Sequence, residues 1–322
     1  MKTITDLVSR YDMLPLGSRV LCAVSGGADS MCLLNWLSYN AETLEISVAA
    51  AHFEHGIRGD ESLRDMAFVE DVCRAMGIQL FIGRGDVPRY AEEKGLGLEE
   101  AARELRYEFL KKTAEQNGFD RIATAHNADD NAETVIFNLA RGSGAAGICG
   151  IPPVRGNIVR PLLETTRTEI ERYLEEHGVS HIEDSTNSSQ QYSRNKIRLQ
   201  IMPVLREINP SVSRAILRTG DMLREDNRLL DQLADEFIAG HFNGESVRSN
   251  ELAALPDAVE ARVIRKLCPQ NVSAVHTNDI MKLAKGTELA FIDVPGARIR
   301  RQKGRIYFTD PPVPKNKKKK QT

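Results

Sequence analysis

The chain has 322 residues, of which 41% are hydrophobic and 27% are charged, with 23 glycines and 13 prolines. This composition is that of an ordinary globular protein long enough for about two domains, and it excludes disordered, collagen-like and disulfide-rich classes. The net charge is -2. No apolar run approaches the roughly 20 residues that cross a bilayer, and the first residues do not resemble a secretory or transit peptide. We therefore expect a cytoplasmic protein without a membrane partner.

The first part of the chain alternates apolar, β-branched or small-residue runs with amphipathic stretches. The runs, at residues 19–24, 46–51, 78–82 and 121–125, predict strands, and the stretches at 30–39, 61–76 and 98–117 predict helices. This order favours an α/β fold of Rossmann-like type, a parallel sheet with helices on both faces. Ligands of such sheets bind beyond the carboxyl ends of the strands.

After about residue 145 the pattern changes. It predicts a helix at 167–177, a polar loop at 183–191, a long helix at 211–240, and short strands at 289–294, 297–301 and 305–308. We therefore divide the chain into a first domain at 1–210, a smaller and mainly helical domain at 211–310, and a basic tail at 311–322.

The basic residues are concentrated near the end of the chain. Residues 298–320 hold ten of the 43 Lys and Arg residues against one acid, which leaves the first 297 residues at 33 minus 44, or -11. A basic end on an acidic body indicates a polyanionic partner. The lysine run alone fits a disordered, solubilising tail equally well.

The most informative segment joins the first predicted strand to the next helix and reads Ser25-Gly26-Gly27-Ala28-Asp29-Ser30. The N–H groups of a glycine-rich turn and of a helix N-terminus converge there, and this geometry binds phosphate. The glycines permit close approach of the backbone, and the two serine hydroxyls can donate further hydrogen bonds.

The segment is not a Walker A loop, because it has Asp29 in place of the lysine that such a loop places at the helix start. An acid beside phosphates needs a cation, so we expect Asp29 to hold Mg²⁺. The alternative is a plain strand, turn and helix in which Asp29 only caps the helix.

This loop resembles the Ser-Gly-Gly-x-Asp-Ser loop of the ATP-pyrophosphatase, or PP-loop, superfamily, whose members activate a carbonyl-type oxygen as an adenylate and release pyrophosphate. The resemblance implies a fold like that of the adenine nucleotide alpha hydrolases. It also implies that residues 25–30 bind ATP as a co-substrate.

Three further segments resemble one branch of that superfamily, the tRNA(Ile)-lysidine synthetase family. They are Ala51-His52-Phe53-Glu54-His55-Gly56-Ile57-Arg58-Gly59, Thr124-Ala125-His126-Asn127-Ala128-Asp129-Asp130-Asn131-Ala132-Glu133-Thr134 followed by Arg141-Gly142-Ser143-Gly144, and Asp184-Ser185-Thr186-Asn187 followed by Tyr192-Ser193-Arg194-Asn195-Lys196-Ile197-Arg198. The resemblance covers about the first 210 residues.

The resemblance implies a ligase that forms a carbon–nitrogen bond. ATP would adenylate the C2 oxygen of the wobble cytidine of a tRNA(Ile) with a CAU anticodon, and L-lysine would then displace AMP to give lysidine. The second domain would bind the tRNA, and the family allows a homodimer. Its members often carry a further C-terminal domain, so we expect this chain to be a short form or to lack it.

His126 and Asp130 stand four residues apart at the start of a predicted helix, so both face the strand ends that carry the glycine loop. We expect Asp130 to position metal or nucleotide together with Asp29, and His126 to bind phosphate or substrate. Glu133, one turn on, can meet the lysine ammonium. The alternative is that the acids complement the helix dipole and that His126 caps the helix.

Arg194 and Arg198 also stand four apart, and their forked guanidinium groups suit the ATP phosphates. Asn195 lies between them in the same motif and is a candidate for binding lysine or tRNA. Arg106 matches an Arg-Tyr position of the family and can bind substrate, although an ion pair within its helix explains it equally well.

His52, His55 and Arg58 follow the second predicted strand and are candidates for lining the substrate site. The two histidines have no third ligand at metal spacing, so we do not expect them to bind a metal.

Two other functions stay open. A tRNA thiolase shares the adenylation step but needs paired cysteines or a cluster, and the five cysteines here contain no Cys-x-x-Cys pair and are expected to be buried. A non-catalytic ATP-binding sensor would need neither a metal acid nor a pyrophosphate clamp.

Overall fold

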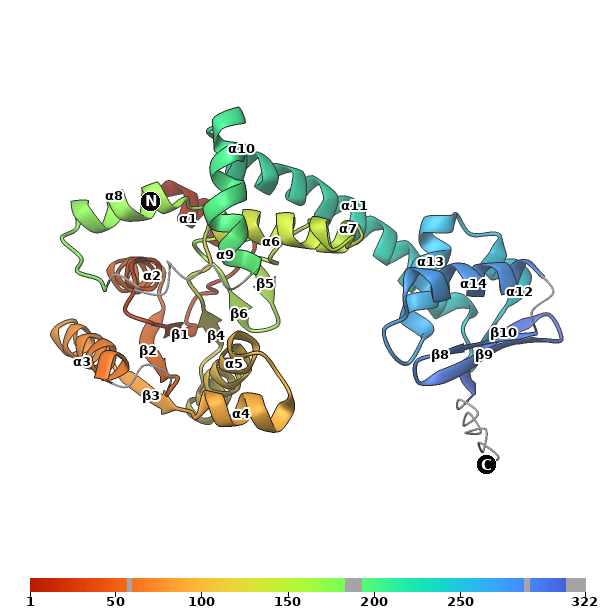
Figure 1. Cartoon of the computed structure of the whole chain (residues 1–322), viewed down its shortest axis with the longest axis horizontal. Helices are drawn as coiled ribbons and strands as arrows, with labels where there is room; N and C mark the ends of the chain where they lie inside the picture. Colours follow the sequence, from red (N-terminus) through yellow and green to blue (C-terminus); the bar gives the residue numbers. More distant parts are fainter. Residues whose placement is uncertain (57–59, 183–192, 287–289, 311–322) are drawn as a thin grey trace, which may run out of the picture. The chain divides into compact units, whose positions relative to one another are not determined.

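The structure is a computed structural model that describes residues 1–56, 60–182, 193–286 and 290–310. It divides the chain into two compact units, Met1–Asp221 and Met222–Thr322 (Figure 1). The division falls inside the long helix α11 (Val212–His241), and the boundary expected at residue 210 lies just before this helix. The basic tail expected at 311–322 lies outside the described residues.

A six-stranded sheet with the order β3-β2-β1-β4-β6-β5 forms the centre of the first unit. Its parallel strands are β1 (Arg19–Ala23), β2 (Ser47–Glu54), β3 (Leu80–Arg84), β4 (Arg121–Ala123) and β6 (Ile158–Val159). The edge strand β5 (Val154–Arg155) pairs antiparallel with β6. The four predicted strands and the predicted parallel sheet are confirmed.

Helices cover both faces of this sheet, as predicted (Figure 1). The described helices of this unit are α1 (Lys2–Arg10), α2 (Ala28–Tyr39), α3 (Asp60–Ala75), α4 (Val87–Lys94), α5 (Leu98–Asn117), α6 (Ala128–Ala140), α7 (Ala145–Ile148), α8 (Arg167–Glu176), α9 (Ser193–Lys196) and α10 (Met202–Ile208), with a π-helical turn η2 (Ile197–Ile201) between the last two. Side chains alternate along β1, so Val20 and Cys22 pack with α1, α2, α3 and α8, whereas Leu21 packs with α5.

The topology brings several loops to one edge of the sheet. The parallel strands β1, β2, β4 and β6 all end there, and the loops that follow them carry the predicted site residues. Helix α5 leads into the start of β4, so it runs back across the sheet and its first turns lie at the same edge. This edge is therefore the place to look for a ligand site.

The second unit combines helices with a small antiparallel sheet. After the end of α11 come β7 (Ser246–Arg248), α12 (Ser249–Ala253), α13 (Asp257–Leu267), α14 (Ala274–Lys285), β8 (Phe291–Val294), β9 (Ala297–Gln302) and β10 (Arg305–Asp310). The three predicted strands pair with β7 in the order β7-β10-β9-β8, and β7 was not predicted because it is only three residues long. Among the described helices of both units, none is long and apolar enough to cross a membrane.

A carboxyl group lies in the core of this second unit. The Glu260 side chain of α13 is fully buried, and neither of its carboxyl oxygens has a hydrogen-bond partner among the described residues. The nearest cation is Lys285, whose Nζ lies 3.8 Å from Glu260 Oε2. Burial raises the pKa of Glu260 from 4.5 to about 7, with the Lys285 charge opposing this shift.

We expect this carboxyl to make the stability of the second unit depend on pH. Because its pKa is raised on folding, its contribution is complete below 4.5 and is lost as the pH rises toward 7. Glu260→Gln should remove most of this dependence, whereas Asp235→Asn, in the same unit with a side chain that is 62% exposed, should not. Calorimetry between about pH 5 and 8 measures the effect, and fluorescence of Trp36, the single tryptophan, follows the first unit as a control. An unchanged pH dependence in the Gln variant would contradict this assignment.

Candidate functional site

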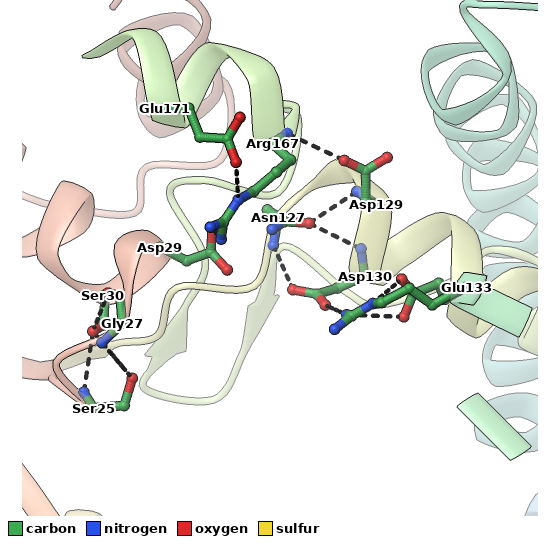
Figure 2. Close-up of polar contacts among 11 residues, drawn as sticks. Ser25, Gly27, Asp29, Ser30, Asn127, Asp129, Asp130, Glu133, Arg167 and Glu171 are labelled. Atoms are coloured by element: carbon green, nitrogen blue, oxygen red, sulfur yellow. Dashed lines mark hydrogen bonds and ion pairs between the residues drawn. The ribbon is translucent and has the colours of Figure 1, made fainter. Parts of the chain in front are cut away.

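The loop between β1 and α2 is held in shape by its own hydroxyl groups (Figure 2). Ser30 Oγ accepts the backbone N–H of Ser25 (3.1 Å) and of Gly26 (3.2 Å) and donates to the carbonyl oxygen of Gly27 (2.9 Å). Ser25 Oγ lies 3.2 Å from Ser30 Oγ and accepts the Gly27 N–H at 3.4 Å. The loop is thus a preformed turn at the N-terminus of α2, which begins at Ala28.

The two glycines of the loop are required for different reasons. Gly26 has a φ of +94°, and a Cβ at this position would lie 2.9 Å from Cδ1 of Ile182. Its carbonyl oxygen also accepts the Ile182 N–H at 2.9 Å, which ties the segment before residue 183 to the loop. Gly27 has an ordinary φ of -73°, so close approach of a ligand, not the turn itself, is what a side chain there would obstruct.

A capping box starts α6 and presents its acids toward the loop (Figure 2). The Asn127 side-chain oxygen accepts the N–H groups of Asp129 and Asp130, both at 2.9 Å, and Asp130 Oδ2 accepts the Asn127 N–H at 3.1 Å. The sequence signal for this cap is an Asn followed three residues later by an acid. The cap fixes Asp130 and Glu133 on one side of the helix.

Asp129, in contrast, joins four helices together. Its Oδ1 accepts from Arg206 of α10 (2.9 Å) and from the Ser213 hydroxyl of α11 (2.6 Å), and its Oδ2 accepts the Arg167 N–H of α8 (3.1 Å). These hydrogen bonds outweigh burial and hold the pKa of Asp129 below its ordinary value. Asp129 is therefore a structural anchor and not a group available to a ligand.

Asp29 points from the first turn of α2 toward α8 and α6 (Figure 2). Its Oδ1 lies 3.1 Å from Nη1 of Arg167, whose Nε donates to Glu171 at 2.8 Å. Burial raises the pKa of Asp29, and the Arg167 charge and the Asn127 side chain oppose this shift. Sequence reasoning missed Arg167, although its place inside a Thr-x-x-Glu capping box, directly after Thr166, could have located it at a helix start.

Asp130 and Glu133 share one cation, the guanidinium of Arg198 in η2. Arg198 Nε lies 2.6 Å from Glu133 Oε1, and its Nη2 lies 3.1 Å from Glu133 Oε2 and 3.0 Å from Asp130 Oδ1. Glu133 is only 4% exposed. The structure thus brings the predicted residues Asp130, Glu133 and Arg198 together, with Arg198 facing the two carboxylates.

The carboxyl of Asp130 titrates close to neutral pH. Burial raises its pKa to about 6, and the nearby charges of Asp29 and Glu133 raise it further, against the Asn127 N–H and Arg198. A group with such a pKa can take up and release a proton under ordinary conditions. The Asp29 charge acts on Asp130, and the Arg198 charge acts on both carboxyls, so the loop acid and the α6 acid lie near one another.

The histidines lie around this site in different ways. His52 is buried, and its Nδ1 donates to the Val24 carbonyl at 2.9 Å, so it supports the base of the glycine loop. Burial also lowers the pKa of His52. His126 Nδ1 lies 3.1 Å from the Thr124 hydroxyl at the end of β4, and His55 packs edge-on against Phe53.

The remaining predicted residues are less well defined. Arg58 lies outside the described residues, and so does the side chain of Arg194, whose backbone lies in α9. Asn195 lies in α9 as well and is partly buried. Arg106 lies in α5, and none of its contacts within the described chain is an ion pair, so the alternative of an ion pair within its helix is wrong.

The carboxylates Asp29 and Asp130 are the groups that could hold a metal. No set of three or more His, Cys, Asp or Glu side chains in the described part of the chain is arranged as a metal site. Two partly buried carboxylates with raised pKa values fit Mg²⁺ instead, because this ion keeps waters and usually takes one or two carboxylates together with ligand phosphates.

Comparison with known proteins identifies a family for the first unit. A family model described as a PP-loop domain matches residues 3–205, which include the glycine loop and the α6 cap. The fold is also similar to that of a U34-tRNA thiolase, NcsA, from Methanococcus maripaludis, with a TM-score of 0.59 over 70% of this chain and 79% of that one. Their sequences are 20% identical, so this likeness concerns the fold alone.

Three similar curated proteins are each named tRNA(Ile)-lysidine synthase. One from Bacteroides thetaiotaomicron is 41% identical over 83% of this chain and 62% of its own, and one from Thermosipho africanus is 44% identical over 66% and 49%. One from Dehalococcoides mccartyi is 34% identical over 91% of this chain and 67% of its own. The chain thus spans between about half and two thirds of the length of these relatives.

The geometry of the glycine loop predicts unequal effects of two similar substitutions. Gly26→Ala forces a side chain into the left-handed region and against Ile182, and should destabilise the first unit by about 2 kcal/mol. Gly27→Ala is the matched control, because its new Cβ would lie 3.6 Å from the nearest atom, Ser25 Oγ, at an ordinary φ. Urea unfolding without nucleotide, followed by Trp36 fluorescence, measures both. Equal losses of stability would show that the turn does not depend on Gly26.

Proposed function

Because the chain belongs to the tRNA(Ile)-lysidine synthase family of PP-loop proteins, we propose that it modifies the wobble cytidine of the CAU-anticodon tRNA(Ile) with L-lysine. ATP adenylates the cytidine C2 oxygen with release of pyrophosphate, and the lysine amine then displaces AMP to give lysidine. The observation that carries the proposal is the meeting of the PP loop with Asp29, Asp130 and Glu133 at one edge of the sheet.

The PP loop is the proposed ATP end of the site. The preformed turn at residues 25–27 and the N-terminus of α2 supply N–H groups and a positive dipole for the phosphates. Ser30 supports this role from inside the turn, because its hydroxyl is already bound to the loop backbone. Asp29 and Asp130 would hold Mg²⁺, which neutralises phosphate charge when bound.

The carboxylate pair of α6 is the proposed lysine end. Asp130 and Glu133 already bind a cation, the Arg198 guanidinium, with three contacts of 3.1 Å or less. A lysine ammonium has the same charge and three N–H donors. The site would therefore admit lysine when Arg198 moves from the carboxylates toward another anion, such as the ATP phosphates that the sequence assigns to it.

We propose that the second unit binds the part of the tRNA that lies outside the active site. We also propose that the protein acts in the cytoplasm, where tRNA is modified. Two arginines lie over aromatic rings on the sheet of the second unit, with Cζ of Arg298, which also pairs with Asp293, 3.9 Å from the Phe291 ring centroid and Cζ of Arg300 4.6 Å from that of Tyr307. Such pairs suit RNA, since guanidinium groups bind phosphates and rings can stack on bases. A homodimer remains a prediction from the family.

The thiolase alternative is disfavoured by the cysteines. All five are buried, and burial raises the pKa of Cys22, Cys32, Cys73 and Cys268, which disfavours the reactive thiolate. The alternative of a non-catalytic ATP-binding sensor does not explain why Asp130 and Glu133 lie together in the site. Neither alternative has an observation of its own in its favour.

The proposed reaction is tested by incubating the protein with ATP, Mg²⁺, labelled lysine and a tRNA(Ile) transcript bearing the CAU anticodon, followed by nucleoside analysis. We expect stable label at the wobble cytidine with release of AMP and pyrophosphate. Asp29→Ala and Asp130→Ala should abolish AMP formation but retain tRNA binding, because both act at the nucleotide. ATP turnover with a different amine or RNA would keep the adenylation and reject lysidine, and no turnover would favour the sensor.

A separate prediction concerns lysine. Glu133→Gln should raise the KM for lysine by about tenfold or more, because a charged hydrogen-bond partner of the ammonium is lost. Formation of the adenylate without lysine should continue. Glu93→Gln is the matched control, since Glu93 also pairs with an arginine, Arg89, but lies 56% exposed on α4. An equal loss of adenylate formation in Glu133→Gln would place Glu133 at the nucleotide.

A further inference from the structure

Four arginines gather on the α5 side of the first unit around one tyrosine, Tyr107. Arg103 and Arg106 of α5 lie with their Cζ atoms 4.9 Å and 5.7 Å from the centroid of the Tyr107 ring. Arg160, directly after β6, interacts electrostatically with Tyr107, Arg103 and Arg155. We call Arg103, Arg106, Arg155, Arg160 and Tyr107 the arginine cluster.

The cluster has no counter-ion in the described part of the chain. None of its four arginines pairs with a carboxylate there, although α5 carries several glutamates. Burial lowers the pKa of both Arg106 and Arg160, Tyr107 opposes this shift, and the neighbouring arginines add to it. Such crowding of like charges is unfavourable unless an anion joins the cluster.

Two buried polar atoms point to the same conclusion. The Arg160 side chain is only 3% exposed, and neither its Nε nor the Tyr107 hydroxyl makes a well-formed hydrogen bond among the described residues, although the two side chains lie close enough for Tyr107 to favour the charge of Arg160. The Arg160 Nη1 donates to the Pro152 carbonyl at 2.6 Å, so one end of this guanidinium anchors the β5–β6 hairpin. That structural role does not account for the unused Nε, nor for the surface positions of Arg103 and Arg155.

The cluster lies at the edge of the sheet where the site is. Arg160 follows β6, whose neighbour β4 leads into the loop of His126, and the Thr124 N–H donates to the Val159 carbonyl at 3.0 Å. Arg103 and Arg106 lie in the first half of α5, the half nearest that edge. The acids of α6 and the arginines of α5 therefore flank the same group of strand ends.

We propose that the arginine cluster is an anion site that binds a backbone phosphate of the RNA substrate beside the wobble nucleotide. This proposal rests on the proposed function and adds to it a docking point on the catalytic unit. Forked guanidinium groups bind phosphate oxygens in pairs, and such contacts position the RNA without reading its sequence. The bound phosphate would supply the negative charge that the cluster lacks.

The test is the salt dependence of tRNA binding. Filter binding of CAU-anticodon tRNA(Ile) between about 50 and 200 mM salt is compared for the wild type and Arg103→Ala/Arg106→Ala. We expect the double variant to bind about tenfold more weakly and the slope of log K against log salt to fall by about 1 to 2. ATP affinity should not change. Arg106→Lys should lose less, because it keeps the charge but not the fork.

Lys111→Ala/Lys112→Ala is the matched control, since it removes two exposed charges from the far half of the same helix. If the wild type forms lysidine while Arg103→Ala/Arg106→Ala and the control bind tRNA alike, the anion site is overturned and the proposed function stands. If ATP affinity falls in the arginine variant, the cluster serves the nucleotide and the RNA contact is also overturned. If the wild type binds no tRNA, both proposals fail.

Discussion

The burial of carboxylates at one edge of a parallel sheet is the constraint on which the site depends. Glu133 is buried there and Asp29, Asp129 and Asp130 are partly buried, and a carboxylate withdrawn from water is costly unless a cation or N–H group compensates it. The chain meets this need for Asp129 with a complete set of partners from three helices. It meets it only partly for Asp29 and Asp130, whose pKa values stay raised.

Asp129 and Asp130 lie in the same helix turn but have different roles: Asp129 stabilises the fold, and Asp130 belongs to the candidate site. Asp129 and Asp130 are neighbours in sequence and accept the same kinds of hydrogen bonds, yet the pKa of one is lowered and that of the other is raised. Asp129 faces α8, α10 and α11, and so holds the helices in place. Asp130 faces the glycine loop, where two further carboxylates repel it. An under-compensated acid of this kind is poised to gain a metal, a proton or an ammonium.

The sequence predicted the sheet, its flanking helices and the meeting of the glycine loop with the α6 acids, because alternating apolar runs and strand-end loops are local signals. It did not predict Arg167 at Asp29 or Arg198 at Glu133, since these contacts join positions 138 and 65 residues apart in sequence. The short strand β7 was missed because three residues carry no periodicity. For Arg106 the sequence left substrate binding and a helical ion pair open, because spacing along a helix allows an ion pair without requiring it, and no such pair forms in the described chain.

Charge of opposite sign on the two sides of the site constrains how substrates could enter. On the α6 side, arginines already occupy the carboxylates, so a cationic substrate must exchange with Arg198, which is 41% exposed and can leave without unfolding a helix. On the α5 side, arginines have no carboxylate partner among the described residues, so an anion can join them without displacing anything. Under the proposed function, RNA would therefore dock without competition, while lysine would bind only when Arg198 finds another anion. We therefore expect nucleotide and RNA to bind before lysine, because their phosphates supply the anion that draws Arg198 away from the carboxylates.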